Sequence, residues 1–209
     1  MYKILPTCLL FAFLIGIVSC TQKTSPSPDR NQIKFNAESC LRTPYMPQKF
    51  RLEMYRAPTP QCVPNGITIN TQQLQQLIKQ SPQPVLIDVL SILSRPNTDF
   101  GETKWLPNKP RQSLPNSVWL PNVGYGTLDQ EMQRYFKSQL DQLTDGDKHK
   151  PLVFFCIADC WMSWNALQRA FDYGFTHLYW YKNGTDGWEE NGLPIQIIEP
   201  VPLSDLSKN

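Results

Sequence analysis

The chain has 209 residues, and its 20 basic and 18 acidic side chains leave a formal net charge of +2. This near balance gives no electrostatic basis for binding nucleic acid, so no nucleic-acid partner is predicted. A chain of this length is enough for one domain with a single substantial core. The 19 prolines indicate long loops in extended conformation. The 6 tryptophans indicate a thick core or, less commonly, an aromatic-lined cleft.

The N-terminal segment has the pattern of an export signal. Lys3 supplies a positive charge, residues 4–18 are almost wholly apolar, and Ser19 and Cys20 follow. The apolar run is too short to span a membrane comfortably. Its end resembles the bacterial lipobox, which implies a lipoprotein signal peptide ending at Ser19, lipidation of Cys20, and a periplasmic protein anchored to the membrane by this lipid. Thr21 follows instead of Asp, which permits delivery to the outer membrane. The alternative is an ordinary signal peptide that leaves Cys20 as a free thiol.

A tether and an arm are predicted to precede the folded domain. Residues 20–34 are polar and contain repeated Ser-Pro, which is typical of a flexible linker. Residues 35–65 carry prolines and scattered aromatic residues without a clear period. We therefore expect an irregular N-terminal arm that packs on the domain.

The cysteines predict disulfides in an oxidising compartment. Cys8 leaves with the signal and Cys20 takes the lipid, so an even number remains. The remaining cysteines are Cys40, Cys62, Cys156 and Cys160. Three connectivities are open, and the simplest pairs Cys40 with Cys62 and Cys156 with Cys160, because each pair shares one segment.

Short apolar runs alternate with amphipathic segments over residues 66–198, and residues 199–209 form a C-terminal tail. Strands are predicted at 67–69, 85–90, 117–120, 151–155 and 177–181. Helices are predicted after a cap at Thr71, after a Thr127–Gln130 capping box, after the loop that follows Cys156, and from Gly184. This order predicts an α/β fold with a central, mostly parallel sheet of about five strands and helices on both faces. The Pro-rich insert at 91–116 reads as irregular, and such a stretch usually covers a site.

The stretch from 155 to 166 is the one most typical of a functional site. Cys156 closes a buried strand, a short loop follows, and an amphipathic helix begins near Trp164. Sites in parallel sheets lie at the carboxyl ends of the strands, where loop N–H groups and the helix N-terminus stabilise anions. We therefore predict a reactive thiolate at Cys156 with a second thiol, Cys160, in the same loop. The alternative is a buried or disulfide-bonded pair without chemistry.

An ordered set of motifs over residues 66–198 resembles the rhodanese domain. The motifs are Leu86-Ile87-Asp88-Val89, Leu114 to Pro121, Val153-Phe154-Phe155-Cys156, Gly174-Phe175, Gly184-Thr185-Asp186-Gly187-Trp188 and Gly192-Leu193-Pro194. The resemblance implies a rhodanese-like fold and a persulfide held on Cys156. The active-site loop it implies comprises Ile157, Ala158, Asp159, Cys160, Trp161, Met162 and Ser163. The chain departs from the pattern because this loop lacks the usual Arg, which clamps dianions. Arg95 and Arg111 of the insert are the candidate anion contacts in its place.

A narrower resemblance covers most of the mature chain. It is carried by Cys160 to Ala166, Tyr55-Arg56-Ala57-Pro58, Trp119 to Gly124 and Gly184 to Glu189. These segments are similar to the periplasmic CXXCW-motif proteins associated with PQQ-dependent alcohol catabolism. The resemblance implies a periplasmic redox protein or a PQQ-dependent dehydrogenase as partner. It supplies no settled reaction and no cofactor-binding residues.

The sequence favours thiol chemistry by persulfide or disulfide exchange, with Cys156 as nucleophile and Cys160 as resolving thiol. Such a protein would be a sulfurtransferase or a thiol-disulfide oxidoreductase. One alternative is sulfur transfer by Cys156 alone. Another is a non-enzymatic module with a structural Cys156–Cys160 disulfide that binds a periplasmic dehydrogenase or cytochrome. A soft metal such as copper(I) on the two thiolates is a third, but His149 and His177 read as surface or packing residues, so no metal and no cofactor are predicted.

Overall fold

The computed structural model describes residues 40, 47, 49–96, 103–106 and 109–203. The predicted signal peptide, the lipidation site Cys20 and the tether lie outside the described residues. None of the described helices is long and apolar enough to cross a membrane.

A five-stranded sheet forms the centre of the molecule, in the order β1-β8-β7-β2-β6. Its strands are β1 (Ile67–Ile69), β2 (Val85–Asp88), β6 (Val118–Trp119), β7 (Leu152–Phe155) and β8 (Leu178–Tyr181). Every neighbouring pair is parallel. The predicted α/β fold with a central parallel sheet of five strands is therefore confirmed. The parallel arrangement brings the carboxyl ends of β2, β7 and β8 to one edge, and this positions the site.

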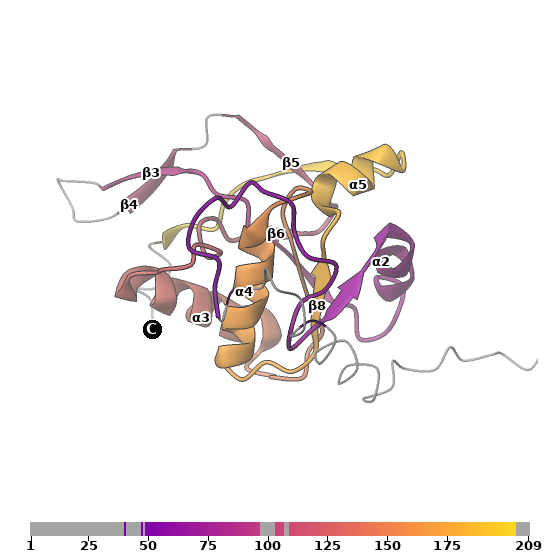
Figure 1. The fold of residues 1–209 in the computed structure, drawn as a ribbon, viewed down its shortest axis with the longest axis horizontal. Helices are drawn as coiled ribbons and strands as arrows, with labels where there is room; N and C mark the ends of the chain where they lie inside the picture. Colours follow the sequence, from indigo (N-terminus) through magenta and orange to yellow (C-terminus); the bar gives the residue numbers. More distant parts are fainter. Residues whose placement is uncertain (1–39, 41–46, 48, 97–102, 107–108, 204–209) are drawn as a thin grey trace, which may run out of the picture.

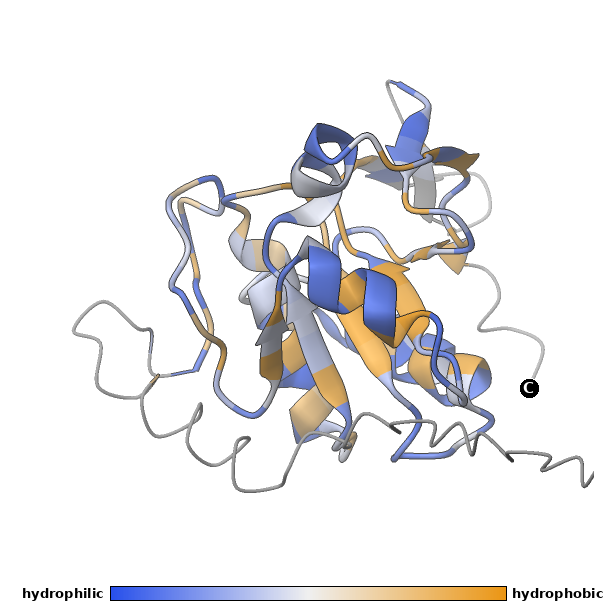
Figure 2. Ribbon diagram, turned by 90° about the vertical axis from the view of Figure 1, so that its right-hand side faces the viewer, coloured by the Kyte–Doolittle hydropathy of each residue, from blue (hydrophilic) through white to orange (hydrophobic). Residues whose placement is uncertain are grey.

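Helices cover both faces of this sheet (Figure 1). The helices are α2 (Thr71–Leu77), α3 (Gln130–Thr144), α4 (Trp161–Asp172) and α5 (Gly184–Glu190). Side chains alternate along a strand, so Phe154 packs in the core shared with α3 and α4, whereas Phe155 packs with α2 and α5. The most hydrophobic ribbon lies at the centre of the molecule, and the outer helices show mixed colouring (Figure 2). Strand β7 is buried along its whole length, as its uninterrupted apolar sequence predicted.

Two helix starts differ from the prediction by one or two residues. Helix α2 is capped by Asn70 rather than Thr71, and the Asn70 side chain accepts a hydrogen bond from the Gln73 amide at 2.9 Å. Helix α3 is capped by Asp129, whose carboxylate accepts from the Met132 amide at 2.8 Å, so the predicted box at Thr127 is wrong. A carboxylate beside the positive end of the helix adds charge stabilisation that a hydroxyl lacks.

The insert at 91–116 is more regular than predicted. Strands β3 (Leu93–Pro96) and β4 (Thr103–Leu106) form an antiparallel hairpin, which extends away from the body in Figure 1. Strand β5 (Arg111–Ser113) pairs with β9 (Gln196–Ile198), also antiparallel. The expectation of an irregular stretch is therefore wrong for these residues. The β5–β9 pair brings Arg111 over the carboxyl edge of the central sheet.

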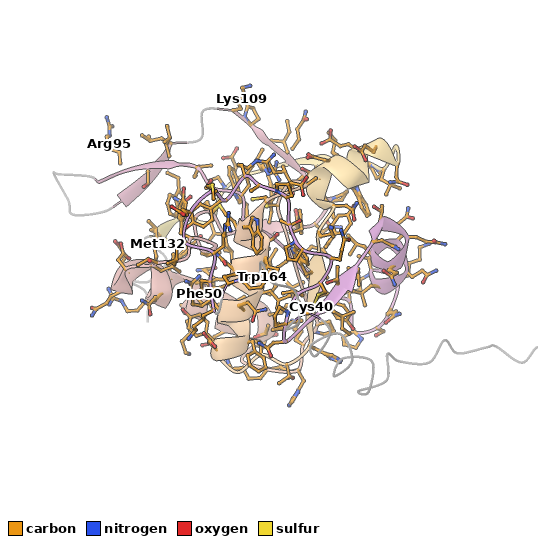
Figure 3. All side chains as sticks on the ribbon, in the orientation of Figure 1. Cys40, Phe50, Arg95, Lys109, Met132 and Trp164 are labelled. Atoms are coloured by element: carbon orange, nitrogen blue, oxygen red, sulfur yellow. A yellow bond between two sulfur atoms is a disulfide. The ribbon has the colours of Figure 1, made fainter. Side chains whose placement is uncertain are left out.

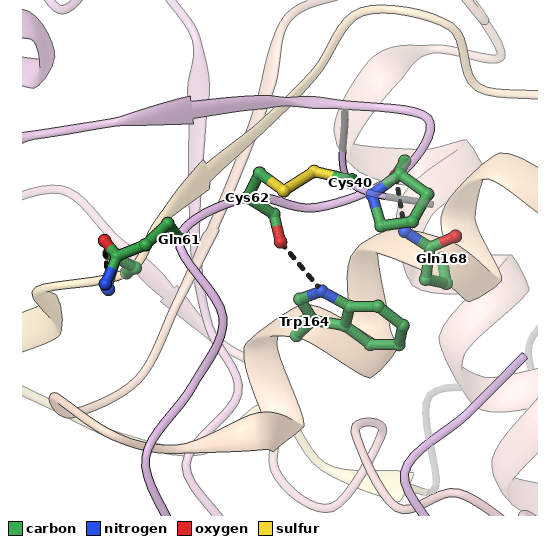
Figure 4. The surroundings of a disulfide bond; sticks show 7 residues. Cys40, Gln61, Cys62, Trp164 and Gln168 are labelled. Carbon is green, nitrogen blue, oxygen red and sulfur yellow. Dashed lines mark hydrogen bonds between the residues drawn. A yellow bond between two sulfur atoms is a disulfide. The ribbon is translucent and has the colours of Figure 1, made fainter. Parts of the chain in front are cut away.

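A disulfide links two segments of the N-terminal arm, and side-chain hydrogen bonds hold the arm to α4. Cys40 and Cys62 are bonded, with their Cα atoms 5.7 Å apart. Figure 4 shows the Cys62 carbonyl accepting from the Trp164 indole of α4, at 3.3 Å. Asn165, which is fully buried, accepts from the Arg51 amide and donates to the Arg51 carbonyl, both at 2.8 Å. The arm is thus held along the first turns of α4.

Candidate active site

The site is built where β7 ends. Cys156 follows Phe155 directly, and Cys160 is the N-cap residue of α4. The Cys156 carbonyl accepts from the Thr185 amide at 2.9 Å, and Ile157 forms a single antiparallel bridge with Gly184. Gly184 has a φ of +58°, and a Cβ added there would lie 2.6 Å from the Cys156 carbonyl oxygen. A glycine is therefore required at 184 by both backbone conformation and space.

Cys156 is a fully buried free thiol at the base of the loop. Its sulfur lies 3.8 Å from the Ser163 hydroxyl, which in turn accepts from the Trp180 indole at 3.0 Å. Burial raises the pKa of the Cys156 thiol well above its usual value, and its hydrogen bond to Cys160 and the nearby Asp88 carboxylate act in the same direction. The Ile157 amide opposes these effects. Cys156 is therefore held in the protonated form.

Cys160 is also free, but it lines an open pocket of about 440 Å³. The hydrogen bond from the Cys156 thiol lowers the pKa of Cys160 to about 7, against the opposing effect of burial. The Met162 amide in the first turn of α4 and the Arg56 guanidinium lower it further. The two thiols thus form an unequal pair, in which Cys160 is the more acidic member.

The arm clamps the loop between the two cysteines. Arg56 forms an isolated antiparallel bridge with Cys160, and its guanidinium donates to the Ala158 carbonyl at 2.8 Å. The exposed Asp159, at a positive φ of 49°, accepts from the Thr59 amide at 3.2 Å. The Trp161 amide donates to the Tyr55 carbonyl at 2.9 Å. These contacts fix the loop conformation from outside.

Two of the loop N–H groups that were expected to stabilise an anion at Cys156 donate to other acceptors. The Ala158 amide donates to the Asp186 carboxylate at 3.1 Å, and the Trp161 amide is taken by the arm. The Ile157 amide lowers the pKa of Cys156, and the Met162 amide lowers the pKa of Cys160. Anion stabilisation in this loop is therefore shared between the two thiols rather than focused on Cys156.

A buried ion pair supports the loop from the side of the sheet. Asp88, at the end of β2, is fully buried, and its carboxylate accepts from Arg111 at 2.7 Å and from the Ser113 hydroxyl at 2.6 Å. It also accepts from the Leu90 amide at 3.0 Å. Burial raises the pKa of Asp88, and the Arg111 charge opposes this. Arg111 in addition donates to the Cys156 carbonyl at 3.4 Å.

The structure brings together most of the predicted site residues. Met162 lines the pocket beside Cys160, Ser163 lies beneath Cys156, and Trp161 and Trp164 are buried. Arg111 reaches the loop, but its guanidinium is engaged by Asp88 and the backbone. Arg95 is exposed on the hairpin, far from Trp164 of α4 in Figure 3.

The cysteine connectivity differs from the simplest prediction in one pair. The Cys40–Cys62 disulfide is present, whereas Cys156 and Cys160 are both free. Within the described residues, no group of three or more His, Cys, Asp or Glu side chains could hold a metal ion.

Sequence reasoning did not single out Arg56 as a site residue. This guanidinium supplies the cation that the loop itself lacks. The available signal was the Tyr55-Arg56-Ala57-Pro58 segment, which stands out in the narrower resemblance.

Cys156 stands at the end of the central strand of a parallel sheet and is followed by a loop and a helix. The family model described as "Rhodanese-like domain" matches residues 70–191, more than half of the chain. The chain therefore belongs to the rhodanese-like domain family.

Similar proteins include thiosulfate sulfurtransferase GlpE of Actinobacillus pleuropneumoniae, which is 37% identical over 54 residues, covering 26% of this chain and 49% of that protein. The chain thus spans about half the length of the curated relatives it matches. A polysulfide-sulfur transferase of Wolinella succinogenes has a TM-score of 0.38 at 21% identity, over 63% of this chain and 79% of the other. Thiosulfate sulfurtransferase of Pseudomonas aeruginosa has a TM-score of 0.44 at 15% identity, over 65% and 21%. At these identities the two structures show a likeness of fold alone.

Proposed function

We propose that this protein carries out thiol or sulfur exchange through the Cys156–Cys160 pair, with one thiol attacking a sulfur substrate and the other resolving the adduct. The observation that carries the proposal is the unequal pair itself. Both thiols are free, and the Cys156 sulfur lies 3.8 Å from the Cys160 carbonyl oxygen, with the pKa of Cys160 lowered to about 7 and that of Cys156 raised. An attacking thiolate beside a protonated partner is the arrangement that disulfide and persulfide exchange requires. The names of the curated relatives, which are sulfurtransferases, support the same chemistry.

The alternative of a non-enzymatic module rested on a structural Cys156–Cys160 disulfide. Both cysteines are free in the structure, which favours exchange chemistry over a permanent bridge. Transfer of a thiosulfate dianion is also disfavoured, because the Arg56 guanidinium is engaged by the Ala158 carbonyl and the Arg111 guanidinium is paired with Asp88.

The test is a single-turnover reaction on protein in which Cys156 and Cys160 are reduced and the Cys40–Cys62 bridge is intact. The protein is mixed with one equivalent of an organic disulfide or of polysulfide, quenched with acid, and analysed by intact mass and peptide mapping. We expect either a Cys156–Cys160 disulfide or a sulfur adduct on one of these cysteines. The matched control is the Cys156→Ser/Cys160→Ser double variant, which keeps the Cys40–Cys62 bridge and should remain unmodified. A wild-type protein that retains both thiols unchanged would contradict the proposal.

We further propose that the protein is a lipoprotein, attached to the outer membrane from the periplasmic side through Cys20, and that it serves PQQ-dependent alcohol catabolism with a periplasmic redox protein or dehydrogenase as partner. The support for lipidation is the apolar run that ends at Ser19 and Cys20. The support for the catabolic role is the resemblance carried by the segment from Cys160 to Ala166, together with the Tyr55–Pro58 segment. A Cys20→Ala variant expressed in a Gram-negative host should move from the membrane fraction to another fraction; unchanged membrane attachment would refute the anchor.

A further inference from the structure

The two thiols share a loop, but they face different surroundings. Cys156 lies beneath the loop with no exposed surface, packed in the core of the α3 and α4 side. Cys160 belongs to the same core and is only 2% exposed, but unlike Cys156 it lines the wall of the pocket of about 440 Å³. A substrate that enters this pocket therefore meets the sulfur of Cys160 before that of Cys156.

The charged side chains around the two sulfurs also favour a thiolate at Cys160 over one at Cys156. The Arg56 guanidinium hydrogen-bonds to Cys160, and its contact with the Ala158 carbonyl holds it against the loop. The charged groups near Cys156 are the Asp88 carboxylate and the Arg111 guanidinium, which neutralise each other as an ion pair. A cation without such a partner stabilises a thiolate, so the negative charge of the pair belongs on Cys160 beside Arg56.

We propose that Cys160 is the attacking thiolate, that Arg56 stabilises it, that Cys156 resolves the adduct from below, and that the substrate is an uncharged organic disulfide with apolar substituents. This assignment rests on the proposed exchange function and reverses the order that the family resemblance implies. The reversal follows from the presence of Cys160, which is both the N-cap residue of α4 and a lining residue of the pocket.

The reaction balances as a dithiol–disulfide exchange. The Cys160 thiolate attacks one sulfur of the substrate disulfide, the substrate S–S bond breaks, and the leaving thiolate takes up a proton. The Cys156 thiol then attacks the Cys160 sulfur and passes its proton to the departing substrate sulfur, which forms the Cys156–Cys160 disulfide and releases the second substrate thiol. The protein dithiol is oxidised by two electrons, and the substrate is reduced to two thiols. A dithiol reductant must return the pair to the starting state.

The pocket wall determines the class of substrate. Most of its side chains are apolar or aromatic: Met54, Tyr55, Ala57, Leu90, Tyr125 and Met162. The remaining lining residues are Arg56, Ser91 and Cys160 itself. Arg56, the cation among the lining residues, already interacts with the Cys160 thiolate and the Ala158 carbonyl. A negatively charged substrate would therefore lose its hydration in the pocket without gaining a cationic partner. An apolar disulfide pays no such penalty.

The location of the adduct tests the assignment directly. Uncharged dipyridyl disulfide is added in one equivalent to the Cys156→Ser and Cys160→Ser variants, and the mixed disulfide is located by peptide mapping. We expect Cys156→Ser to accumulate a stable adduct on Cys160, and Cys160→Ser to react at least about tenfold more slowly. Thiol counts after denaturation and circular dichroism verify that each variant is folded and carries its remaining thiol.

The possible failures of this experiment are distinguishable. An adduct on Cys156 in Cys160→Ser, formed at the wild-type rate while Cys156→Ser stays unmodified, would overturn the assignment and leave the exchange function intact. Two inert single variants, together with a wild-type protein that forms no Cys156–Cys160 disulfide, would overturn both.

The role of Arg56 is tested by the pH dependence of alkylation with uncharged iodoacetamide. The titratable and charged groups that face Cys160 are Cys156 beneath it, Arg56 and Tyr55 on the arm, and Tyr125 across the pocket, with the exposed Asp159 preceding it in the loop. In the Cys156→Ser background, Arg56→Gln should shift the alkylation profile to higher pH and slow the reaction at neutral pH by about tenfold, the effect of one pKa unit. Arg56→Lys should restore most of the rate.

Lys49→Gln is the matched control, because it removes an arm cation that pairs with Asp172 on the far end of α4. It should leave the profile unchanged. An Arg56→Gln profile that coincides with that of the control would overturn the role of Arg56.

The substrate class is tested with two disulfides. The rate with dipyridyl disulfide is compared with that of a dicarboxylated aromatic disulfide, each divided by its rate with free cysteine. A normalised preference for the dicarboxylate would overturn the apolar assignment.

Discussion

The Asp88–Arg111 pair is predicted to be the main electrostatic support of the active-site loop. Asp88 is fully buried, and the Arg111 side chain is only 10% exposed, so the pair is shielded from water. Arg111→Met keeps much of the apolar stem and leaves the carboxylate buried without its cation. Removing one partner of a buried pair typically costs about 3–5 kcal/mol. The Ser113 hydroxyl and the Leu90 amide still donate to Asp88, so we expect about 3 kcal/mol, the lower end of that range.

The sign of the pH dependence follows from the Asp88 carboxyl. Its pKa in the folded protein is already raised by burial, and loss of Arg111 raises it further. A group with a raised folded pKa adds stability below its unfolded pKa, and this stability is lost as the pH rises through the folded value. The cost of Arg111→Met should therefore be largest near neutral pH and should shrink as the pH falls and Asp88 takes up a proton.

The assay is urea denaturation of wild type, Arg111→Met, Asp88→Asn and the double variant, at neutral and mildly acidic pH. The double variant removes the stranded charge and should recover much of the stability lost in Arg111→Met. A single-variant cost below about 1 kcal/mol at neutral pH, the range of exposed pairs, would refute the reasoning. So would a cost that grows on acidification.

Three further predictions concern how the loop and arm are held. Gly184→Ala should lower the free energy of unfolding by at least about 1 kcal/mol more than Gly192→Ala, because both have positive φ but only at 184 does the new Cβ meet backbone atoms; equal losses in chemical denaturation would contradict this. Asn165→Ala should cost about 2 kcal/mol and speed proteolysis near Arg51, since it leaves the Arg51 backbone and the Gly124 carbonyl without their buried partner; an unchanged cleavage rate would argue against the tie. Cys40→Ser/Cys62→Ser should cost about 3 kcal/mol, from the chain-entropy value for a sequence separation of 22, as measured by thermal unfolding; a variant as stable as wild type would show that the bond does not restrain the arm.

Much of the fold could be predicted because its signals are local. The apolar run from Leu152 to Phe155 indicated a buried strand, and the order of strands and helices indicated a parallel sheet with its site at the carboxyl edge. The position of Cys156 at that edge follows from the same pattern. The helix cap at the start of α3 could not be fixed from the sequence, because Asp129 and Thr127 both carry capping side chains and only packing decides between them.

The features that were missed depend on contacts between distant segments. The β5–β9 pair joins Arg111 to Ile198, and no local pattern in a Pro-rich insert shows such pairing. Arg56 meets the Ala158 carbonyl across 102 positions of sequence. The relative acidity of the two thiols depends on this contact and on Asp88, so it could not be read from the spacing of the cysteines.

The most direct test of the exchange function is the redox potential of the Cys156–Cys160 pair. Protein made in an oxidising compartment is equilibrated in graded thiol buffers, alkylated, and analysed by intact mass, with the Cys40–Cys62 bridge followed separately. A thiolate stabilised at Cys160 favours the reduced pair and makes the disulfide easier to reduce. We predict a midpoint within the range of thiol carriers, about −120 to −270 mV. A pair that forms no bridge, or one whose midpoint lies below about −300 mV as in structural disulfides, would contradict the account.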